Sequence, residues 1–248
     1  MHILVVNPNT TASMTETIAA AARAAAGPST VIEAVTSAMG PASIEGYYDE
    51  ALAVPGLLAE IARGERAGAA AAVIACFDDT GLDAARAMAA IPVIGICEAA
   101  LSLASFLARR FSVVTMSERS LVPITELVRR YGMEPRASVR ALGVPVLDLE
   151  DPSSDAVAAL RDEITRALKE DHAEAIVLGC AGMADLAAAL QGEFGIPVVD
   201  GVGAAVKQAE ALVTLGLSTG KRGAYARPAA KPYTGLLAGF GIEDTAVA

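Results

Sequence analysis

Two cysteines occupy corresponding positions in an internal repeat of this chain. Cys76 and Cys180 each follow a short apolar run and precede a stretch of small residues. Both copies then continue with the same tripeptide, Ile-Pro-Val, at 91–93 and at 196–198. A thiolate can take a proton from carbon, and a thiol can give one back. A repeated unit that places two thiols face to face across a cleft could therefore invert the configuration of a carbon atom.

The surroundings of the two thiols would give them different protonation states. A thiol just before a helix lies near the positive end of the helix dipole, which favours the thiolate form. Asp78 and Asp79 follow Cys76 closely, and a neighbouring carboxylate opposes this effect because it raises the pKa of a thiol. We expect Cys76 to be the thiol and Cys180 the thiolate when no substrate is bound.

The alternative interpretation is that both cysteines are core residues, because free cysteine is among the most buried residue types. Their place at strand ends, and at the same point of a repeat, favours a chemical role instead. Cys97 differs from both, since it has no counterpart in the second copy, where Val202 stands at the corresponding position. We interpret Cys97 as a core residue.

The composition indicates a globular protein of one large or two small domains. The chain has 248 residues, of which 54% are hydrophobic, and this is enough for a substantial core. The formal net charge of −10 at pH 7 disfavours a nucleic-acid partner, since binding to phosphates needs a basic surface. No stretch is long and apolar enough to predict a membrane span, and the first residues do not predict a signal peptide.

Other kinds of catalytic site find little support in the sequence. Three cysteines do not make a disulfide framework, and their spacing is not that of a zinc site, so we expect reduced thiols, a cytoplasmic location and no bound metal. The only histidines, His2 and His172, are not placed to act as the base of a Ser–His or Cys–His pair. Gly201-Val202-Gly203 is similar to the start of a dinucleotide-binding motif, but Val206 replaces its third glycine, so helix packing explains these glycines better.

Strand and helix signals alternate along the chain, and the pattern restarts at about residue 111. Apolar, β-branched runs predict strands at 2–6, 31–35, 71–75, 93–96, 111–115, 139–142, 175–178 and 198–199. The stretches between them predict helices at 12–26, 50–67, 81–90, 98–109, 120–131, 154–171, 183–193 and 203–215. The tail from residue 221 is richer in Gly, Pro and Tyr and is expected to pack irregularly over one domain.

This alternation predicts an α/β protein with two similar domains, each a mostly parallel sheet flanked by helices. We place the first domain at 1–105 plus about 206–248 and the second at 106–205. Ligands of such sheets bind at the carboxyl ends of the strands. Asn9, Cys76, Thr115 and Cys180 all lie just past the ends of predicted strands.

Four motifs together resemble a known family. They are Asn7-Pro8-Asn9-Thr10-Thr11, Gly40-Pro41-Ala42-Ser43-Ile44-Glu45-Gly46-Tyr47, Ala75-Cys76-Phe77-Asp78-Asp79 and Leu178-Gly179-Cys180-Ala181-Gly182-Met183. The chain resembles, over nearly its whole length, the hydantoin racemase family, which includes allantoin racemases and belongs to the aspartate/glutamate racemase superfamily. The resemblance implies two pseudo-symmetric domains with the active site in the cleft between them, racemisation without a cofactor, and Cys76 and Cys180 as the two bases.

The substrate that the resemblance implies is a 5-substituted hydantoin, a small neutral ring whose C5 hydrogen lies next to a carbonyl group. One thiolate would remove this hydrogen, and the opposite thiol would protonate the other face of the enolate-like carbanion. Polar groups and backbone N–H groups would hold the ring oxygens. We expect a homo-oligomer whose substrate-binding residues are Asn9, Ser43, Ile44, Phe77, Thr115, Gly182 and Met183.

Other functions stay open at this point. A ureido group as the 5-substituent would make the protein an allantoin racemase of purine catabolism. Related families that lack one cysteine decarboxylate or cis–trans isomerise their substrates, whereas this chain has both cysteines. A protein that binds a small molecule in the cleft without chemistry is the alternative from a different class, and the matched thiols disfavour it.

Overall fold

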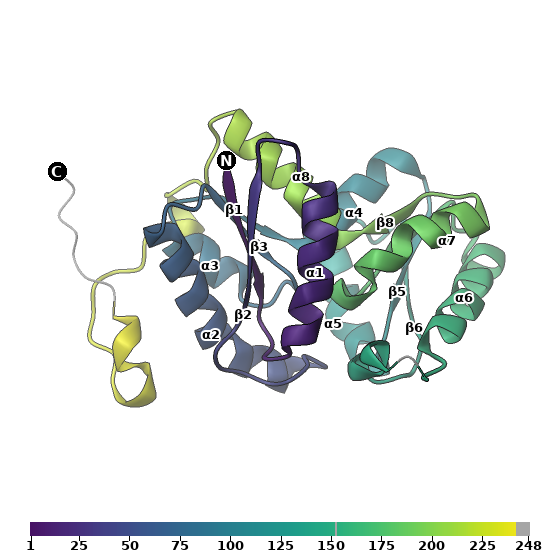
Figure 1. Cartoon of the computed structure of the whole chain (residues 1–248), viewed down its shortest axis with the longest axis horizontal. Helices are drawn as coiled ribbons and strands as arrows, with labels where there is room; N and C mark the ends of the chain where they lie inside the picture. The colour runs from purple at the N-terminus through teal and green to yellow at the C-terminus, as the bar shows by residue number, and fades with distance from the viewer. Residues whose placement is uncertain (152, 242–248) are drawn as a thin grey trace.

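Two four-stranded parallel sheets lie side by side in the computed structural model, which describes residues 1–151 and 153–241 (Figure 1). The strand order is β2-β1-β3-β4 in one sheet and β6-β5-β7-β8 in the other, so the two halves share one order. The predicted α/β class and two-domain arrangement are confirmed. The strands are β1 (His2–Asn7), β2 (Val31–Thr36), β3 (Ala71–Ile74), β4 (Val93–Gly95), β5 (Phe111–Thr115), β6 (Ala137–Ala141), β7 (Ala175–Leu178) and β8 (Val198–Asp200).

The inner strands are short and almost wholly apolar. Every residue of β3, β5 and β7 is buried, and strands without an exposed face need helices on both sides. The pairing also repeats, because Val5 lies opposite Val73 in the first sheet and Val113 lies opposite Val177 in the second. The residues that follow β3 and β7 therefore occupy equivalent places in the two halves.

Helices cover both faces of the two sheets. They are α1 (Ala12–Ala25), α2 (Tyr47–Arg66), α3 (Leu82–Met88), α4 (Ile96–Leu107), α5 (Leu121–Arg130), α6 (Ala156–Arg166), α7 (Ala187–Phe194) and α8 (Gly201–Thr214). Shorter helical turns are η1 (Glu118–Ser120), η2 (Val146–Glu150), η3 (Ala167–Asp171), η4 (Ala181–Leu186), η5 (Gly223–Tyr225) and η6 (Gly235–Phe240). Within the described part of the chain, none of the helices combines the length and the apolar character that crossing a bilayer requires.

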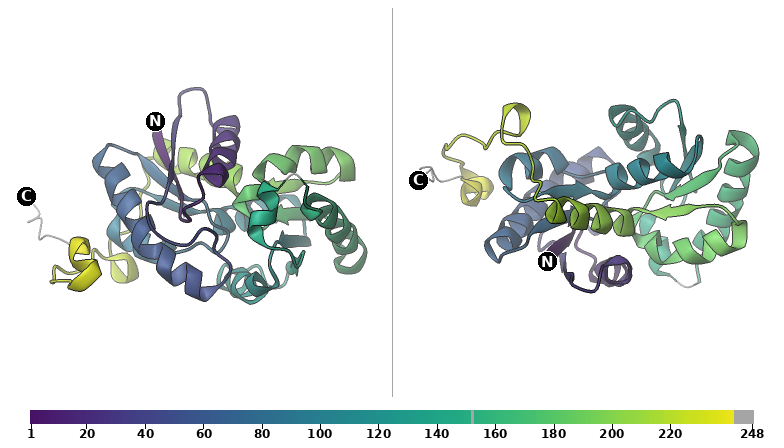
Figure 2. Two further views of the ribbon diagram at one scale, coloured as in Figure 1. Left: turned by 60° about the horizontal axis from the view of Figure 1, so that its bottom comes forward. Right: turned by 90° about the horizontal axis from the view of Figure 1, so that it is seen from above.

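Helices α4 and α8 form the junction between the halves. Each follows the last strand of one sheet and packs against the other sheet, α4 on β7 and β8, and α8 on β3 and β4. The two helices also pack against each other, and α8 runs along the junction (Figure 2). Cys97 and Val202 are the second residues of α4 and α8, and both are fully buried in a core that spans the two sheets. The division of the chain near residues 105 and 205 stays a prediction.

Some helix boundaries differ from those predicted. Helix α2 begins at Tyr47, before the predicted residue 50, and continues through Pro55. Tyr47 therefore stands on the first turn of a helix, with its side chain exposed. Helix α4 begins directly after the third residue of β4, so Cys97 lies within the helix and not after a longer strand. Tertiary packing on the second sheet draws these residues into α4.

The segment after α8 runs to the edge of the first half and away from it (Figure 1). Lys221 Nζ donates to the backbone oxygen of Ala87 at 3.2 Å, and the Tyr225 hydroxyl donates to Asp83 Oδ1 at 2.9 Å. These contacts tie the segment to α3 and its end. The irregular structure expected here is found up to residue 241, and the expectation for 242–248 lies outside the described residues.

Replacing Gly201 with alanine should destabilise the junction. A Cβ atom at Gly201 would lie 2.7 Å from the backbone oxygen of Ile96, which cannot move without moving α4. We expect Gly201→Ala to lower the free energy of unfolding by about 1–3 kcal/mol. Gly192 in α7 is the matched control, because a Cβ atom there meets nothing within 4 Å. Gly192→Ala should raise the free energy of unfolding by up to about 1 kcal/mol. Thermal unfolding that showed both substitutions to be stabilising, or both to be destabilising, would contradict the packing argument.

Candidate active site

A cavity lies between the halves at the carboxyl ends of the inner strands. The ends of β1 and β3 contribute residues from one half, and the ends of β5 and β7 contribute residues from the other. Residues from α1, from the connection before α2, from η1 and from η2 close the sides of the cavity. Its lining residues are Asn9, Met14, Ile44, Ala75, Cys76, Phe77, Asp78, Thr115, Ser120, Val146, Gly179, Cys180 and Ala181.

Asn9 presents a hydrogen-bond donor on the first side of the cavity. Its Oδ1 atom accepts from Asn7 Nδ2 at 2.8 Å and from the Thr11 backbone N–H at 3.0 Å. The amide oxygen is thus occupied by its own turn, and the Nδ2 atom contacts only Met14 Sδ at 3.5 Å. An amide held in this way is suited to donate to a carbonyl oxygen of a bound molecule.

Thr115 and Gly179 shape the second side. The Thr115 hydroxyl donates to the backbone oxygen of Gly179 at 3.1 Å, which joins the end of β5 to the turn after β7. A Cβ atom at residue 179 would lie 2.9 Å from the backbone oxygen of Val114, so the turn passes too close to β5 for any side chain. Cys180 then caps η4, and its backbone oxygen accepts from the Met183 N–H at 3.1 Å.

Cys76 is held by a tight turn and not by a helix. Its backbone oxygen accepts from the Asp79 N–H at 3.0 Å, and α3 begins only at Leu82. The expectation that Cys76 sits at a helix N-terminus is therefore wrong, whereas Cys180 does stand at the start of a helical turn. Cys76 and Cys180 are both partly exposed, and Cys97 is buried.

The carboxylate of Asp79 fixes this turn to the junction. It accepts from the backbone N–H groups of Cys97 and Glu98, each at 3.0 Å, and from the Tyr131 hydroxyl at 2.7 Å. Asp79 thereby caps the start of α4 and also bonds to the end of α5 in the other half. Its backbone has φ +47°, a conformation that residues other than glycine adopt only with support.

The electrostatic environment of the cavity disfavours negative charge. Burial and then the Asp78 carboxylate raise the pKa of the Cys76 thiol well above its usual range, and Cys180 adds to the rise. Burial, Glu50 and Asp79 raise the pKa of Asp78 to about 7. Lysine, arginine and histidine are absent from the residues that line the cavity. A bound anion would therefore find no cationic partner there.

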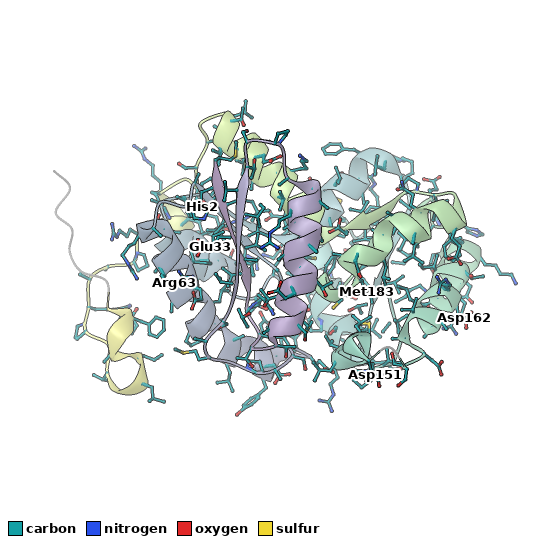
Figure 3. All side chains as sticks on the ribbon, in the orientation of Figure 1. His2, Glu33, Arg63, Asp151, Asp162 and Met183 are labelled. Atoms are coloured by element: carbon teal, nitrogen blue, oxygen red, sulfur yellow. The ribbon has the colours of Figure 1, made fainter. Side chains whose placement is uncertain are left out.

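Most of the predicted site residues line this cavity, namely Asn9, Ile44, Cys76, Phe77, Thr115 and Cys180. Ser43 does not, since its hydroxyl donates to Glu45 Oε1 at 2.9 Å. Gly182 is also absent from the lining, although a Cβ atom there would lie 3.8 Å from Cys180 Sγ. Met183 is fully buried in the core of the second half (Figure 3). The roles assigned to all of these residues stay predictions.

Several lining residues could not be found from the sequence. Met14 lies on α1, Ser120 precedes α5, and Val146 belongs to the connection between β6 and α6. None of them comes directly after an inner strand, so the rule that ligands bind at strand ends does not select them. Asp78 was recognised only as a neighbour of Cys76, although it lines the cavity itself.

The histidines lie away from the cavity, as expected. His2 Nε2 is 2.9 Å from Glu33 Oε2 on the first sheet, where Figure 3 labels both residues. His172 follows η3 in the second half. Across the residues that the structure describes, no cluster of three or more His, Cys, Asp or Glu side chains could hold a metal ion.

The sequence matches the family described as Asp/Glu/Hydantoin racemase over residues 3–209. The chain belongs to this family. It is 50% identical over 246 residues to the hydantoin racemase of Pseudomonas sp. strain NS671, covering 99% of both proteins. It is 51% identical over 236 residues to that of Rhizobium meliloti, covering 95% of this chain and 98% of the other. The solved allantoin racemase from Klebsiella pneumoniae is 48% identical, with a TM-score of 0.95 over 97% of this chain and 99% of that one.

Family membership makes this protein an isomerase of the racemase type. The relatives named for hydantoin and the relative named for allantoin are about equally similar to it. The match extends through β8 and most of α8, so it includes both strand-end cysteines and the cavity between them. The two turns that follow β3 and β7 are therefore part of the shared family fold.

Replacing Asp78 with asparagine should stabilise this racemase at neutral and alkaline pH. Between about pH 4 and pH 7 the folded protein keeps a proton on Asp78 that the unfolded chain has released, so stability falls as the pH rises through this range. Asp78→Asn removes this loss. It should raise the free energy of unfolding by about 1–4 kcal/mol above pH 7 and leave it unchanged below pH 4. Thermal unfolding at several pH values measures the gain in stability, and a gain that did not depend on pH would contradict the raised pKa of Asp78.

Proposed function

We propose that this racemase inverts C5 of 5-substituted hydantoins, with Cys76 and Cys180 as the two proton-transfer groups. The observation that carries the proposal is the make-up of the cavity, which has two thiols at equivalent strand ends and no cationic lining residue. Aspartate or glutamate, which carries two carboxylates and one ammonium group, would bring net negative charge beside Asp78 with no lining cation to balance it, which is unfavourable in a buried site. A hydantoin ring is neutral and avoids this cost.

In the proposed mechanism a proton crosses the substrate from one thiol to the other. The thiolate of one cysteine takes the C5 proton, and the electron pair left on C5 spreads onto the adjacent carbonyl oxygen. The thiol of the opposite cysteine then protonates the other face of C5. After one turnover the cysteines have exchanged protonation states, and the enzyme is ready for the opposite enantiomer. The raised pKa of Cys76 supports this residue as the thiol in the free enzyme.

The remaining lining residues suit a small ring. The Nδ2 group of Asn9, whose contact is the weak acceptor Met14 Sδ, can donate to the carbonyl oxygen that becomes negatively charged. The Thr115 hydroxyl already donates to Gly179, so it can only accept, for example from a ring N–H. Ile44, Phe77 and Val146 give the cavity apolar walls that help to exclude water from the carbanion.

Allantoin, which carries a ureido group at C5, is the second candidate substrate. The 48% identity to the Klebsiella pneumoniae allantoin racemase favours it. Asp78 and Ser120 also offer polar groups that a ureido substituent could use, whereas the apolar walls favour hydrocarbon substituents. Both substrates share the hydantoin ring, so the proposed mechanism is the same for either.

Substitution of either strand-end cysteine should abolish racemisation. We expect Cys76→Ser and Cys180→Ser each to lower kcat/KM by at least about 100-fold, the range for loss of a positioned acid or base. Cys97→Ser is the matched control, and it should keep nearly full activity despite some loss of stability from the buried hydroxyl. In deuterium oxide, each inactive variant should still exchange C5 hydrogen of one enantiomer. Full racemase activity in either variant would reject the two-thiol mechanism.

A substrate panel tests the choice of hydantoins. We expect the optical rotation of L- and D-5-benzylhydantoin to fall to zero faster than in a blank without enzyme, with the same rate in the presence of EDTA. L-aspartate and L-glutamate should keep their rotation, because the cavity has no cation for their carboxylates. Enantiopure allantoin in the same assay ranks the two candidates by kcat/KM. Racemisation of the free amino acids alone, or activity that needed added metal, would overturn the proposal.

A further inference from the structure

Thr80 lies in the turn between Cys76 and α3 and is fully buried. Its backbone is fixed on both sides, by Asp79 with its bonds to α4 and by Gly81, which adopts a left-handed conformation with φ +64°. Thr80 does not line the cavity, so a substrate cannot reach its hydroxyl. The position of this side chain is therefore set by the protein alone.

The hydroxyl of Thr80 has no hydrogen-bond partner. Among the described residues it is the only buried side-chain nitrogen or oxygen atom left in this state. Buried hydroxyl groups are nearly always paired, because leaving them unpaired costs the full desolvation of the group. The unpaired Thr80 hydroxyl would be explained by a hydrogen-bond acceptor that becomes available in only one state of the protein.

Cys76 stands at the start of the same turn, and its sulfur atom is the candidate for that acceptor. Burial and the Asp78 carboxylate raise the pKa of the thiol, while the Thr80 hydroxyl and the Asp78 backbone N–H oppose the rise. A neutral thiol is only a weak hydrogen-bond acceptor. A thiolate is a strong acceptor, and a hydrogen bond to an anion is stronger than one between neutral groups. A hydrogen bond from the Thr80 hydroxyl to this sulfur atom would therefore be much more favourable when Cys76 has lost its proton.

We propose that Thr80 is a positioning residue whose hydroxyl donates to Cys76 Sγ when this cysteine becomes a thiolate during racemisation. The inference rests on the proposed role of Cys76 as one of the two bases. Asp78, Cys180 and Cys97 also face Cys76, and a negative charge on any of them works against its ionisation. Thr80 is the side chain that offsets them, in a site with no cation.

Alkylation of Cys76 tests this hydrogen bond without any substrate. The full-length protein is treated with iodoacetamide at a series of pH values, and mass spectrometry of the Cys76 peptide gives the rate. We expect Thr80→Val, which keeps the shape and removes the hydroxyl, to raise the pKa of Cys76 by about one unit. Thr80→Ser should restore the wild-type profile, because it restores the donor.

Stability separates this role from a merely structural one. Thr80→Val removes an unpaired hydroxyl, so its Tm should equal or exceed that of the wild type. Ser112→Ala is the matched control, since Ser112 is buried and its hydroxyl donates to Asp171 Oδ2 at 2.7 Å. Ser112→Ala should lower the Tm and leave the alkylation profile of Cys76 unchanged.

Racemisation provides the second readout. At neutral pH we expect Thr80→Val to lower kcat/KM about tenfold for both enantiomers, in line with the smaller thiolate fraction. A wild-type alkylation profile in Thr80→Val, or failure of Thr80→Ser to restore it, would overturn the inference. If hydantoins are not racemised but the alkylation profile shifts as expected, the hydrogen bond stands and the proposed substrate fails.

Discussion

The carboxylate of Asp79 is the interaction on which the rest of the site depends. It holds the backbone of the turn after Cys76, caps the first turn of α4 and binds the Tyr131 hydroxyl from the second half. A Cβ atom at Gly95 would lie 2.2 Å from Asp79 Oδ1, so the strand before α4 must end in glycine for this contact to form. One buried group thereby sets the position of a thiol and joins the two halves that carry opposite walls of the cavity.

The second constraint is the shortage of positive charge. Burial raises the pKa of Cys76, Asp78 and Asp79, and the cavity wall contains no cation to counter this. In the mechanism that we propose, hydrogen-bond donors such as the Asn9 amide and the Thr80 hydroxyl stabilise the anions instead. Fixed donors in a site of low polarity act more strongly on a developing charge than they would in water.

The two halves are alike in topology but differ around their thiols. Cys180 starts a helical turn directly, whereas the longer turn after Cys76 carries the two aspartates and Thr80 before α3 begins. The substrate that we propose needs one acid and one base at any moment, so unlike surroundings for the two thiols fit the reaction. The exchange of α4 and α8 between the sheets keeps these unlike turns on opposite sides of one cavity.

The sequence by itself determined the periodic features of this protein. Buried strands, the repeat and the place of Cys76 and Cys180 just past β3 and β7 follow from local composition, because apolar runs and turn residues act over a few positions. Tertiary structure decided what depends on contacts between distant segments. Val146 and Met14 reach the cavity, Ser43 turns toward Glu45, and a turn that Asp79 anchors to α4 separates Cys76 from α3. These outcomes rest on packing and on desolvation across the junction, and neither leaves a pattern in the order of residues.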